Sequence, residues 1–147
     1  MLNQQEISDR LEIADLLTRY TLAIDRGDWD GLDTVFTDDA RIDYAATGGT
    51  VGAYPQVKQW LAEMLPVFAR RQHVLGQVQV RLNGGPGDTA AATAYFLNPM
   101  VLRQEDGSEQ VWEFGGYYHH ALVRTPHGWR SRELVEELAW KRGVPQP

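Results

Sequence analysis

General base catalysis commonly uses a histidine oriented by a carboxylate, and this sequence offers one such candidate pair. His73 lies in RRQHVLGQVQVRL, and an imidazole has an unperturbed pKa close to neutral pH. Its orientation needs an acceptor, usually a carboxylate, and Asp25 at the end of an apolar helical stretch is a candidate. Alternation places Val74, Val78 and Val80 on the strand face opposite His73. A solvated Asp25 and an exposed or simply hydrogen-bonded His73 stay open as alternatives.

Polar residues also interrupt two apolar strand patterns further along the chain. In AATAYFLNPMVL, Asn98 lies among apolar neighbours, and the following Pro99 favours an edge or a bulge. Asn98 is therefore either exposed at an edge or a placed hydrogen-bonding group. In FGGYYHHALV, alternation puts Phe114, Tyr118 and His120 on one face. The paired glycines there predict a bend, or the close approach of a ligand or a backbone segment.

Other kinds of catalytic site have little support in the sequence. The adjacent histidines of FGGYYHHALV point to opposite faces, and no HExxH pattern occurs, so we expect no tightly bound metal. A nucleophilic enzyme lacks its usual signals, because there is no cysteine and no GxSxG motif. The stretch NGGPGD, residues 83–88, has the composition of a turn. Glu133, Glu136 and Glu137 are expected on an exposed face of the last strand.

Length and charge place the chain among ordinary globular proteins. Its 147 residues, 43% hydrophobic and 23% charged, predict one domain over residues 1–147. The net charge of −6, with no basic stripe, argues against a nucleic-acid partner. No window approaches 18 apolar residues and the N-terminus has no signal-peptide pattern. We therefore expect a cytoplasmic protein that does not contact a membrane.

Helical periodicity dominates the first half of the sequence. Residues 4–24 predict a long amphipathic helix that Gly27 ends, and Asp28 can cap a short helix after it. Residues 40–46 predict a strand and residues 55–65 a further helix. This order predicts an α+β fold, with a sheet curved against the first helix and a concave side for ligands. The β-rich runs of the second half are residues 73–82, 90–103, 110–124 and 129–140.

Several stretches together resemble one known protein family. They are a Y-x4-D element from Tyr20 to Asp25, the following GDWDGLDTVFTDDA, the strand RIDY, a Q-H-x-x-G strand, and a late GG-x-Y strand leading into GW. The combination is similar to the SnoaL-like, or scytalone dehydratase-like, branch of the nuclear transport factor 2-like superfamily, over nearly the whole chain. The resemblance implies a cystatin-like α+β cone: a curved antiparallel mixed sheet wrapped around a long N-terminal helix, with two shorter helices. It leaves the activity open, because this cone carries dehydratases, isomerases, cyclases, dehydrochlorinases and non-catalytic binders.

The resemblance also assigns roles to particular residues. In scytalone dehydratase-like, bile-acid dehydratase-like and dehydrochlorinase-like members, an aspartate ending the first helix pairs with a histidine on a barrel strand. Asp25 and His73 match these two positions. A tyrosine that bile-acid dehydratase-like members carry five residues before the aspartate is matched by Tyr20. The tyrosine in the RIDY strand of scytalone dehydratase-like proteins is matched by Tyr44.

This chain departs from the family pattern at three positions. Asn98 falls near a second histidine or an aspartate of some relatives, His120 replaces a serine, and Leu122 replaces an asparagine. The oxyanion-polarising groups of any one relative therefore do not transfer. The catalytic candidates are His73, Asp25 and Tyr20; the substrate-binding candidates are Tyr44, Trp29, Phe96, Asn98, Phe114, Tyr118 and His120, with Trp60, Met100 and Trp112 as further apolar walls.

The implied activity is that of a lyase or isomerase, of dehydratase or cyclase type, that needs no cofactor. Its substrate would be a small, mostly apolar cyclic molecule such as a polyketide, steroid or aromatic intermediate. His73, oriented by Asp25, would remove a proton from carbon, while Tyr20, Tyr44 or Tyr118 donates to the developing oxyanion. Two alternatives stay open: a non-catalytic ligand-binding or accessory protein on the same fold, and the small subunit of a ring-hydroxylating oxygenase. A homodimer is expected because the outer sheet face needs cover, and a trimer is the alternative.

Overall fold

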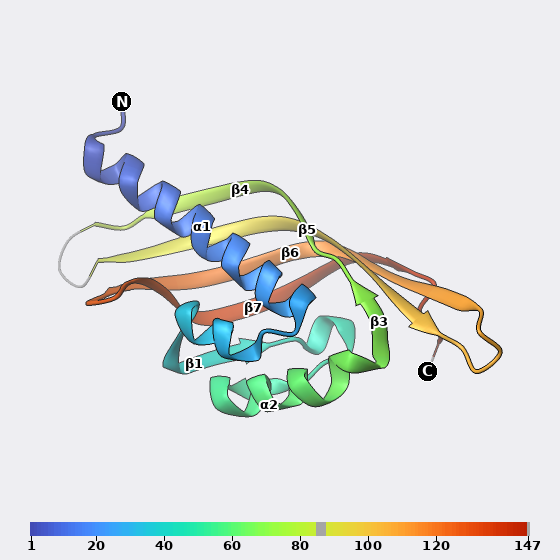
Figure 1. The fold of residues 1–147 in the computed structure, drawn as a ribbon. Coiled ribbons are helices and arrows are strands. Elements are labelled where there is room, and N and C mark those ends of the chain that lie inside the picture. The colour runs from blue at the N-terminus through green and yellow to red at the C-terminus, as the bar shows by residue number, and fades with distance from the viewer. Residues whose placement is uncertain (85–87, 147) are drawn as a thin grey trace.

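The fold is one curved sheet that packs against a long helix. A computed structural model describes residues 1–84 and 88–146 of the chain. Helix α1 crosses one face of the seven-stranded sheet, and helix α2 lies beyond strand β1 at one end (Figure 1). Short 3₁₀ helices at Trp29–Thr34, Ala45–Thr47 and Leu65–Val67 connect these elements. The arrangement confirms the α+β cone that the sequence predicts.

Helix α1, Gln4–Arg26, has a defined start and stop that place the functional residues at its end. Asn3 caps it, since its side chain accepts from the Glu6 backbone N–H at 2.8 Å and Glu6 accepts from the Asn3 backbone N–H at 2.9 Å. The helix ends at Gly27, whose φ of 68° is a left-handed conformation that glycine adopts without strain. The buried stripe that packs on the sheet comprises Ile13, Leu16, Leu17, Tyr20, Ala23 and Ile24.

The sheet is mixed, with one parallel pair. Its strands follow the order β2-β1-β7-β6-β5-β3, and β4 also pairs with β5. Among the described strands only the β1–β7 pair is parallel, whereas the long β5–β6–β7 meander is antiparallel. The strands are β1 Phe36–Asp43, β2 Val51–Ala53, β3 Phe68–Arg71, β4 Val74–Leu82, β5 Thr89–Arg103, β6 Glu109–Thr125 and β7 Gly128–Arg142.

Several boundaries differ from the sequence predictions. The strand predicted at residues 40–46 begins at Phe36, because Phe36 already pairs with β7, and it ends at Asp43. Strands β2 and β3 were not predicted; each is short and lacks the alternation that identifies a strand. Helix α2, Tyr54–Met64, confirms the predicted helix at residues 55–65. The turn predicted at residues 83–88 falls partly on residues 85–87, which lie outside the described part of the chain.

Strand β4 corrects the prediction of a single valine face opposite His73. Its pairing with β5 shifts register between Leu75 and Val78, so the set of alternate residues whose side chains point inward changes along the strand. Val74 and Val78 are therefore exposed, whereas Val80 is half-buried against the core. His73 lies one residue before β4, at the junction with β3.

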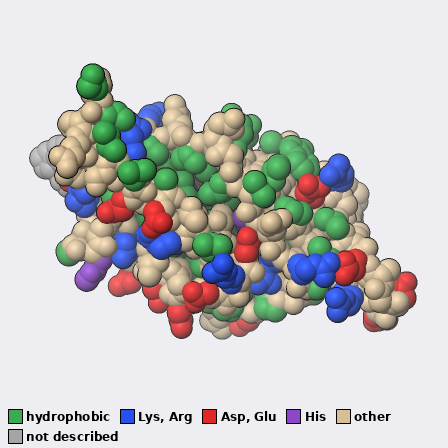
Figure 2. Space-filling view, turned by 45° about the horizontal axis from the view of Figure 1, so that its top comes forward, with side chains coloured by type: hydrophobic (Ala, Val, Ile, Leu, Met, Phe, Trp, Pro, Cys, Tyr) green, Lys and Arg blue, Asp and Glu red, His purple; other side chains and the backbone are tan. Residues whose placement is uncertain are grey.

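The described surface carries charges of both signs. On the face in Figure 2, acidic and basic side chains are interspersed and no broad basic area appears among the described residues. None of the described helices is long and apolar enough to span a membrane.

Candidate active site

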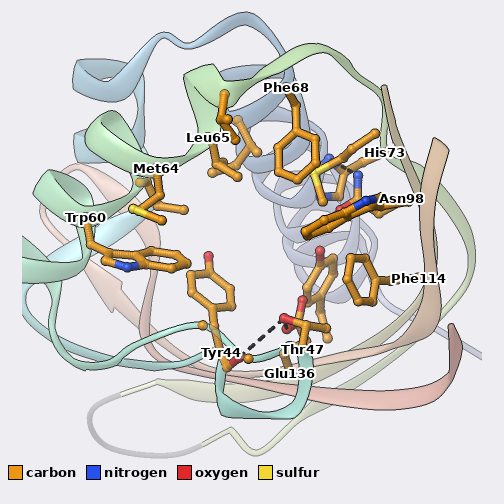
Figure 3. Close-up of a pocket in the computed structure, with 18 of the residues that line it drawn as sticks. Tyr44, Thr47, Trp60, Met64, Leu65, Phe68, His73, Asn98, Phe114 and Glu136 are labelled. Atoms are coloured by element: carbon orange, nitrogen blue, oxygen red, sulfur yellow. Dashed lines mark hydrogen bonds between the residues drawn. The ribbon is translucent and has the colours of Figure 1, made fainter. Parts of the chain in front are cut away.

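A cavity of about 300 Å³ lies between the end of α1, the β1–α2 region and the inner face of the sheet. Its walls are largely apolar, and the aromatic rings of Trp60, Phe68 and Phe114 form part of them (Figure 3). His73 lies on one side of this cavity, and Glu136 on another (Figure 3). The polar side chains of the lining are those of Tyr20, Tyr44, Thr47, His73, Asn98, Tyr118 and Glu136.

Asp25 and His73 form a closely bonded pair at the wall of this cavity. Asp25 Oδ1 lies 2.6 Å from His73 Nδ1, and Asp25 Oδ2 accepts from the His73 backbone N–H at 2.8 Å. The side chains are only 17% and 5% exposed, respectively. The carboxylate therefore assigns the ring proton to Nδ1, and Nε2 has no hydrogen-bond partner among the described residues. A ring held this way has the free lone pair that a general base uses.

Arg71 holds the end of α1 in the position that this pair requires. Its Nε donates to the Ile24 carbonyl at 3.1 Å, and its Nη1 donates to the Leu65 carbonyl at 2.9 Å. A cation at a helix C-terminus satisfies carbonyls that have no partner inside the helix. Because Arg71 lies on β3, it ties the last turn of α1, which carries Asp25, to the segment that carries His73.

Asn98 lies beside the Asp25–His73 pair and hydrogen-bonds to the backbone of the preceding residue, Gln72. Its Nδ2 donates to the Gln72 carbonyl at 3.0 Å, and the Pro99 carbonyl accepts from the Gln72 N–H at 3.1 Å. Asn98 Nδ2 is also 3.5 Å from His73 Nδ1, but both nitrogens are donors when Nδ1 bonds Asp25, so we do not count this contact as a hydrogen bond. Asn98 thus fixes the residue before His73.

Three buried tyrosines provide hydroxyl groups in the cavity. The hydroxyls of Tyr20 and Tyr44 are 2.5 Å apart, and the ring of Tyr118 lies 6.2 Å from that of His73, centroid to centroid. Burial raises the pKa of Tyr20, Tyr44 and Tyr118 well above the ordinary value for a phenol. The three hydroxyls are therefore protonated at neutral pH. One of Tyr20 and Tyr44 donates to the other, which leaves one hydroxyl of that pair and the hydroxyl of Tyr118 able to donate to a developing oxyanion.

Glu136 is a lining residue that sequence reasoning missed. It was expected on an exposed face of β7, but it is only 8% exposed and lines the cavity. The register of β7 against β6 shifts near Ser131, so the inward face changes from Trp129 and Ser131 to Leu134 and Glu136. The signal that identifies it is the pattern L-x-E-x-L at residues 134–138, where a glutamate shares a face with two leucines.

Three residues predicted to bind substrate do not line this cavity. Phe96 stacks behind Tyr118, with ring centroids 4.1 Å apart. Trp29 lies under the Arg71 guanidinium, 5.7 Å from the ring centroid, at the start of its 3₁₀ helix. His120 is buried in the core, where its Nδ1 lies 2.8 Å from Ser131 Oγ, and burial lowers its pKa to about 3. Phe96 and His120 thus pack behind the lining residues Tyr118 and Tyr20. The other predicted lining residues, Tyr20, Tyr44, Trp60, His73, Asn98, Met100, Trp112, Phe114 and Tyr118, do line it.

Within residues 1–84 and 88–146, no group of three His, Asp or Glu side chains is placed to hold a metal ion. The chemistry that the described side chains support at this cavity is proton transfer by His73 and hydrogen-bond donation by the tyrosines.

The sequence has close relatives along nearly its whole length. Residues 5–135 match the family model of the SnoaL-like domain. The "Uncharacterized protein Rv2910c" of Mycobacterium tuberculosis (strain ATCC 25618 / H37Rv) is 46% identical over 142 residues, which cover 97% of this chain and 93% of that protein.

Three solved structures share the fold over nearly all of both chains. A "putative aromatic ring hydroxylase" of Novosphingobium aromaticivorans is 29% identical, with a TM-score of 0.79 and 94% of each chain covered. A "Putative Scytalone Dehydratase" of the same species is 13% identical, with a TM-score of 0.82 and coverages of 96% and 91%. A "Hexachlorocyclohexane dehydrochlorinase (LinA) Type2" is 17% identical, with a TM-score of 0.79 and coverages of 96% and 92%. The match to the family model over most of its length shows that the chain belongs to the SnoaL-like domain family.

Proposed function

We propose that residues 1–147 form a single-domain lyase or isomerase that acts without a cofactor on a small, mostly apolar cyclic substrate. The observation that carries this proposal is the 2.6 Å contact between His73 Nδ1 and Asp25 Oδ1 at the wall of a largely apolar cavity. Orienting one ring nitrogen through a carboxylate leaves the other as a general base of fixed direction.

The reaction that these groups support starts at a carbon next to a carbonyl. His73 Nε2 accepts the proton, the C–H electron pair moves onto the carbonyl oxygen, and a tyrosine hydroxyl donates to that oxygen. Return of the proton to a different carbon is an isomerisation. Alternatively, the enolate electron pair re-forms the carbonyl and a C=C bond as a leaving group departs from the neighbouring carbon. A halide leaves as the anion, and a hydroxyl leaves as water with the proton held by His73; this elimination is a lyase reaction.

The names of two structural neighbours support an elimination or related reaction. A dehydratase removes water and a dehydrochlorinase removes hydrogen chloride, and both reactions break a C–H bond. At identities of 13% and 17% these structures establish the shared fold, so their substrates are not assigned to this chain.

The test is solvent deuterium exchange into a panel of cyclic ketones and hydroxy-ketones that includes 2-tetralone, followed by NMR in deuterated water. We expect the wild-type protein to exchange protons next to the carbonyl of at least one ketone faster than buffer does. His73→Gln should lower the catalysed rate by about 10²–10⁴-fold, because general base catalysis contributes that much. Asp25→Asn should lower it too, since an amide can present its NH₂ group to Nδ1 and turn the imidazole to the wrong tautomer.

A matched control is His119→Gln, which replaces a histidine on the outer sheet face. His119 is bonded there to Glu137 at 2.6 Å and does not line the cavity. Exchange at the wild-type rate is expected for this variant. Exchange that survives His73→Gln, or that His119→Gln lowers equally, contradicts the proposal.

A second candidate is an accessory subunit of a ring-hydroxylating oxygenase. The observation that favours it is the 29% identity to the structure named as a ring hydroxylase. Co-purification of the chain with a larger iron-containing protein from its own cells, without exchange activity of the isolated chain, supports this candidate over the first.

We also propose that the chain forms a homodimer through the outer face of the sheet. Large apolar side chains on this face, such as Tyr95, Leu97 and Val135, are between 36% and 50% exposed. Exposed apolar side chains that gather on one sheet face are typical of an interaction surface.

A further inference from the structure

Glu136 is a carboxyl group in the cavity that the proposed reaction does not use. It projects from β7 on the same face as Leu134 and Leu138, and only 8% of the residue is exposed. Thr47 Oγ1 donates to Glu136 Oε1 at 2.6 Å (Figure 3). Apart from the Tyr118 hydroxyl, which lies near the carboxyl group, the other oxygen, Oε2, has no partner among the described residues. One carboxyl oxygen is therefore left for a ligand.

The surroundings of Glu136 disfavour its charged form. Burial raises the pKa of this carboxyl group to about 7; the hydrogen bond from Thr47 lowers it in part, and the negative charge of Asp43 raises it further. The hydroxyl of Tyr118 has a smaller, lowering effect. Below about pH 7, most Glu136 side chains therefore carry a proton.

The remaining groups that face Glu136 do not supply a compensating positive charge. The phenols of Tyr20 from α1, Tyr44 from the end of β1 and Tyr118 from β6 stay neutral. The Asp25–His73 pair lies on a different side of the cavity (Figure 3). No lysine or arginine among the described residues lines the cavity.

We propose that Glu136 holds the ligand as a neutral carboxylic acid, donating a hydrogen bond from Oε2 to a carbonyl oxygen. The substrate class is then uncharged cyclic ketones rather than carboxylates of the same size. The inference rests on the proposed function for the identity of the reacting carbon, but the hydrogen bond to the carbonyl can be measured without turnover.

The chemistry of this contact follows from where charge develops. When the C–H bond breaks, the proton goes to His73 Nε2 and the electron pair reaches the carbonyl oxygen as an enolate. A hydrogen bond from Glu136 to this oxygen strengthens as the negative charge grows, and Glu136 retains its proton at the end. A ligand carboxylate would instead meet an acid that ionises with rising pH and no cation in the wall.

The experiment measures binding of 2-tetralone, labelled with ¹³C at the carbonyl, and of tetrahydro-2-naphthoate as an anion of similar size. Quenching of tryptophan fluorescence reports affinity, because Trp60 and Trp112 line the cavity. We expect ketone affinity to fall about tenfold in Glu136→Leu, as for a lost hydrogen bond. The bound carbonyl ¹³C resonance should also move back towards its value in apolar solvent.

The pH dependence separates Glu136 from its neighbours. Wild-type affinity for the ketone should fall as pH rises through about 7, because the ionised carboxylate no longer donates. Glu136→Gln, which still donates through its amide, should bind the ketone independently of pH and bind the naphthoate more tightly than wild type does. Glu133→Gln, an exposed position on the same strand, is the matched control and should behave as wild type.

Two readouts keep this inference apart from the proposed function. In His73→Gln, deuterium exchange should vanish while the ketone still binds with the wild-type carbonyl shift and pH dependence. Normal ketone affinity and carbonyl shift in Glu136→Leu would overturn the role of Glu136, whatever the exchange rate. Failure of the wild-type protein to bind the ketone at millimolar concentration, or tighter binding of the naphthoate, would overturn it as well.

Discussion

At the scale of single residues, the surroundings of two carboxyl groups, Asp25 and Glu136, give them different roles at the cavity. Asp25 accepts from both the ring and the backbone of His73, so the backbone N–H fixes the carboxylate and rotation of the imidazole would break its hydrogen bond to that carboxylate. Glu136 has one hydrogen bond from Thr47 and an apolar strand face around it. Two carboxyl groups of the same chemistry are thus given different tasks, one orienting an imidazole and one able to carry a proton at neutral pH.

Glu136 predicts a specific dependence of stability on pH. Its pKa is about 7 in the folded chain, against an ordinary value of 4.5, so the folded state holds a proton that the unfolded state has already released. Its stabilising contribution is complete below pH 4.5 and is lost as pH rises through about 7. The free energy of unfolding of wild type, minus that of Glu136→Gln, should fall across this window by on the order of 3 kcal/mol.

Urea denaturation at a series of pH values measures this difference. Taking the difference between two proteins cancels the contributions of other titrating groups to the free energy of unfolding. Asp9 is one of them: the hydrogen bond from Arg124 lowers its pKa, so its effect on stability has the opposite sign. A difference that stays constant across the window means that Glu136 ionises normally in the folded protein.

The sequence predicted one of these two carboxyl groups and missed the other. Residue types alone made Asp25 and His73 candidates, and the family resemblance supplied the pairing that spacing did not. The structure brings them together as predicted. Glu136 was missed because the glutamates of the last strand were all expected on an exposed face, and a bulge that changes the inward face leaves no mark in composition.

At the scale of elements, the paired glycines of β6 determine how closely β7 can approach. A Cβ added at Gly116 would lie 2.0 Å from the Glu137 carbonyl oxygen, and one at Gly115 would lie 2.3 Å from the indole of Trp140. The pairing of β6 with β7 shifts register between these glycines. The sequence predicted a bend or a close approach here, and the group that approaches is the backbone next to Glu136.

Gly116→Ala should therefore destabilise the protein. The new methyl group cannot fit against a backbone carbonyl, so β6 and β7 must separate, at a cost of about 1–3 kcal/mol for overpacking. Thermal denaturation followed by circular dichroism should show a lower midpoint. Gly76→Ala is the comparison, because its Cβ would meet only the Tyr95 Cβ at 3.3 Å and should cost less. Equal midpoints for the two variants would contradict the argument.

The long elements of the fold were predictable and the short ones were not. Helix α1 has a full amphipathic period and both of its end signals, and strands β5 to β7 are long alternating runs between turns. Strands β2 and β3 have only three and four residues. They form because β1 and β5 offer them a free edge, which is a property of the tertiary structure.

At the scale of the whole molecule, the two faces of the sheet differ in what covers them. Helix α1 covers the inner face, whereas the described chain leaves the outer face uncovered (Figure 1). On that outer face Tyr95 and Tyr117 form an edge-to-face pair with centroids 4.8 Å apart. Because β6 and β7 line the cavity with their inner residues, an interface on their outer residues would also stiffen the wall that carries Tyr118 and Glu136.

The predicted homodimer can be measured by sedimentation velocity at micromolar concentrations. We expect a species of twice the 16.6 kDa chain mass, with Tyr95→Lys shifting the population to monomer, because a charge at the centre of an apolar contact is desolvated without a partner. Leu11→Lys is the matched control, since Leu11 is 68% exposed on α1 and away from the outer face, and it should stay dimeric. A species of three times the chain mass that Tyr95→Lys still dissociates keeps the outer face as the interface and changes only the symmetry. A wild-type protein that sediments as a monomer, or a dimer that Leu11→Lys disrupts and Tyr95→Lys does not, contradicts assembly through this face.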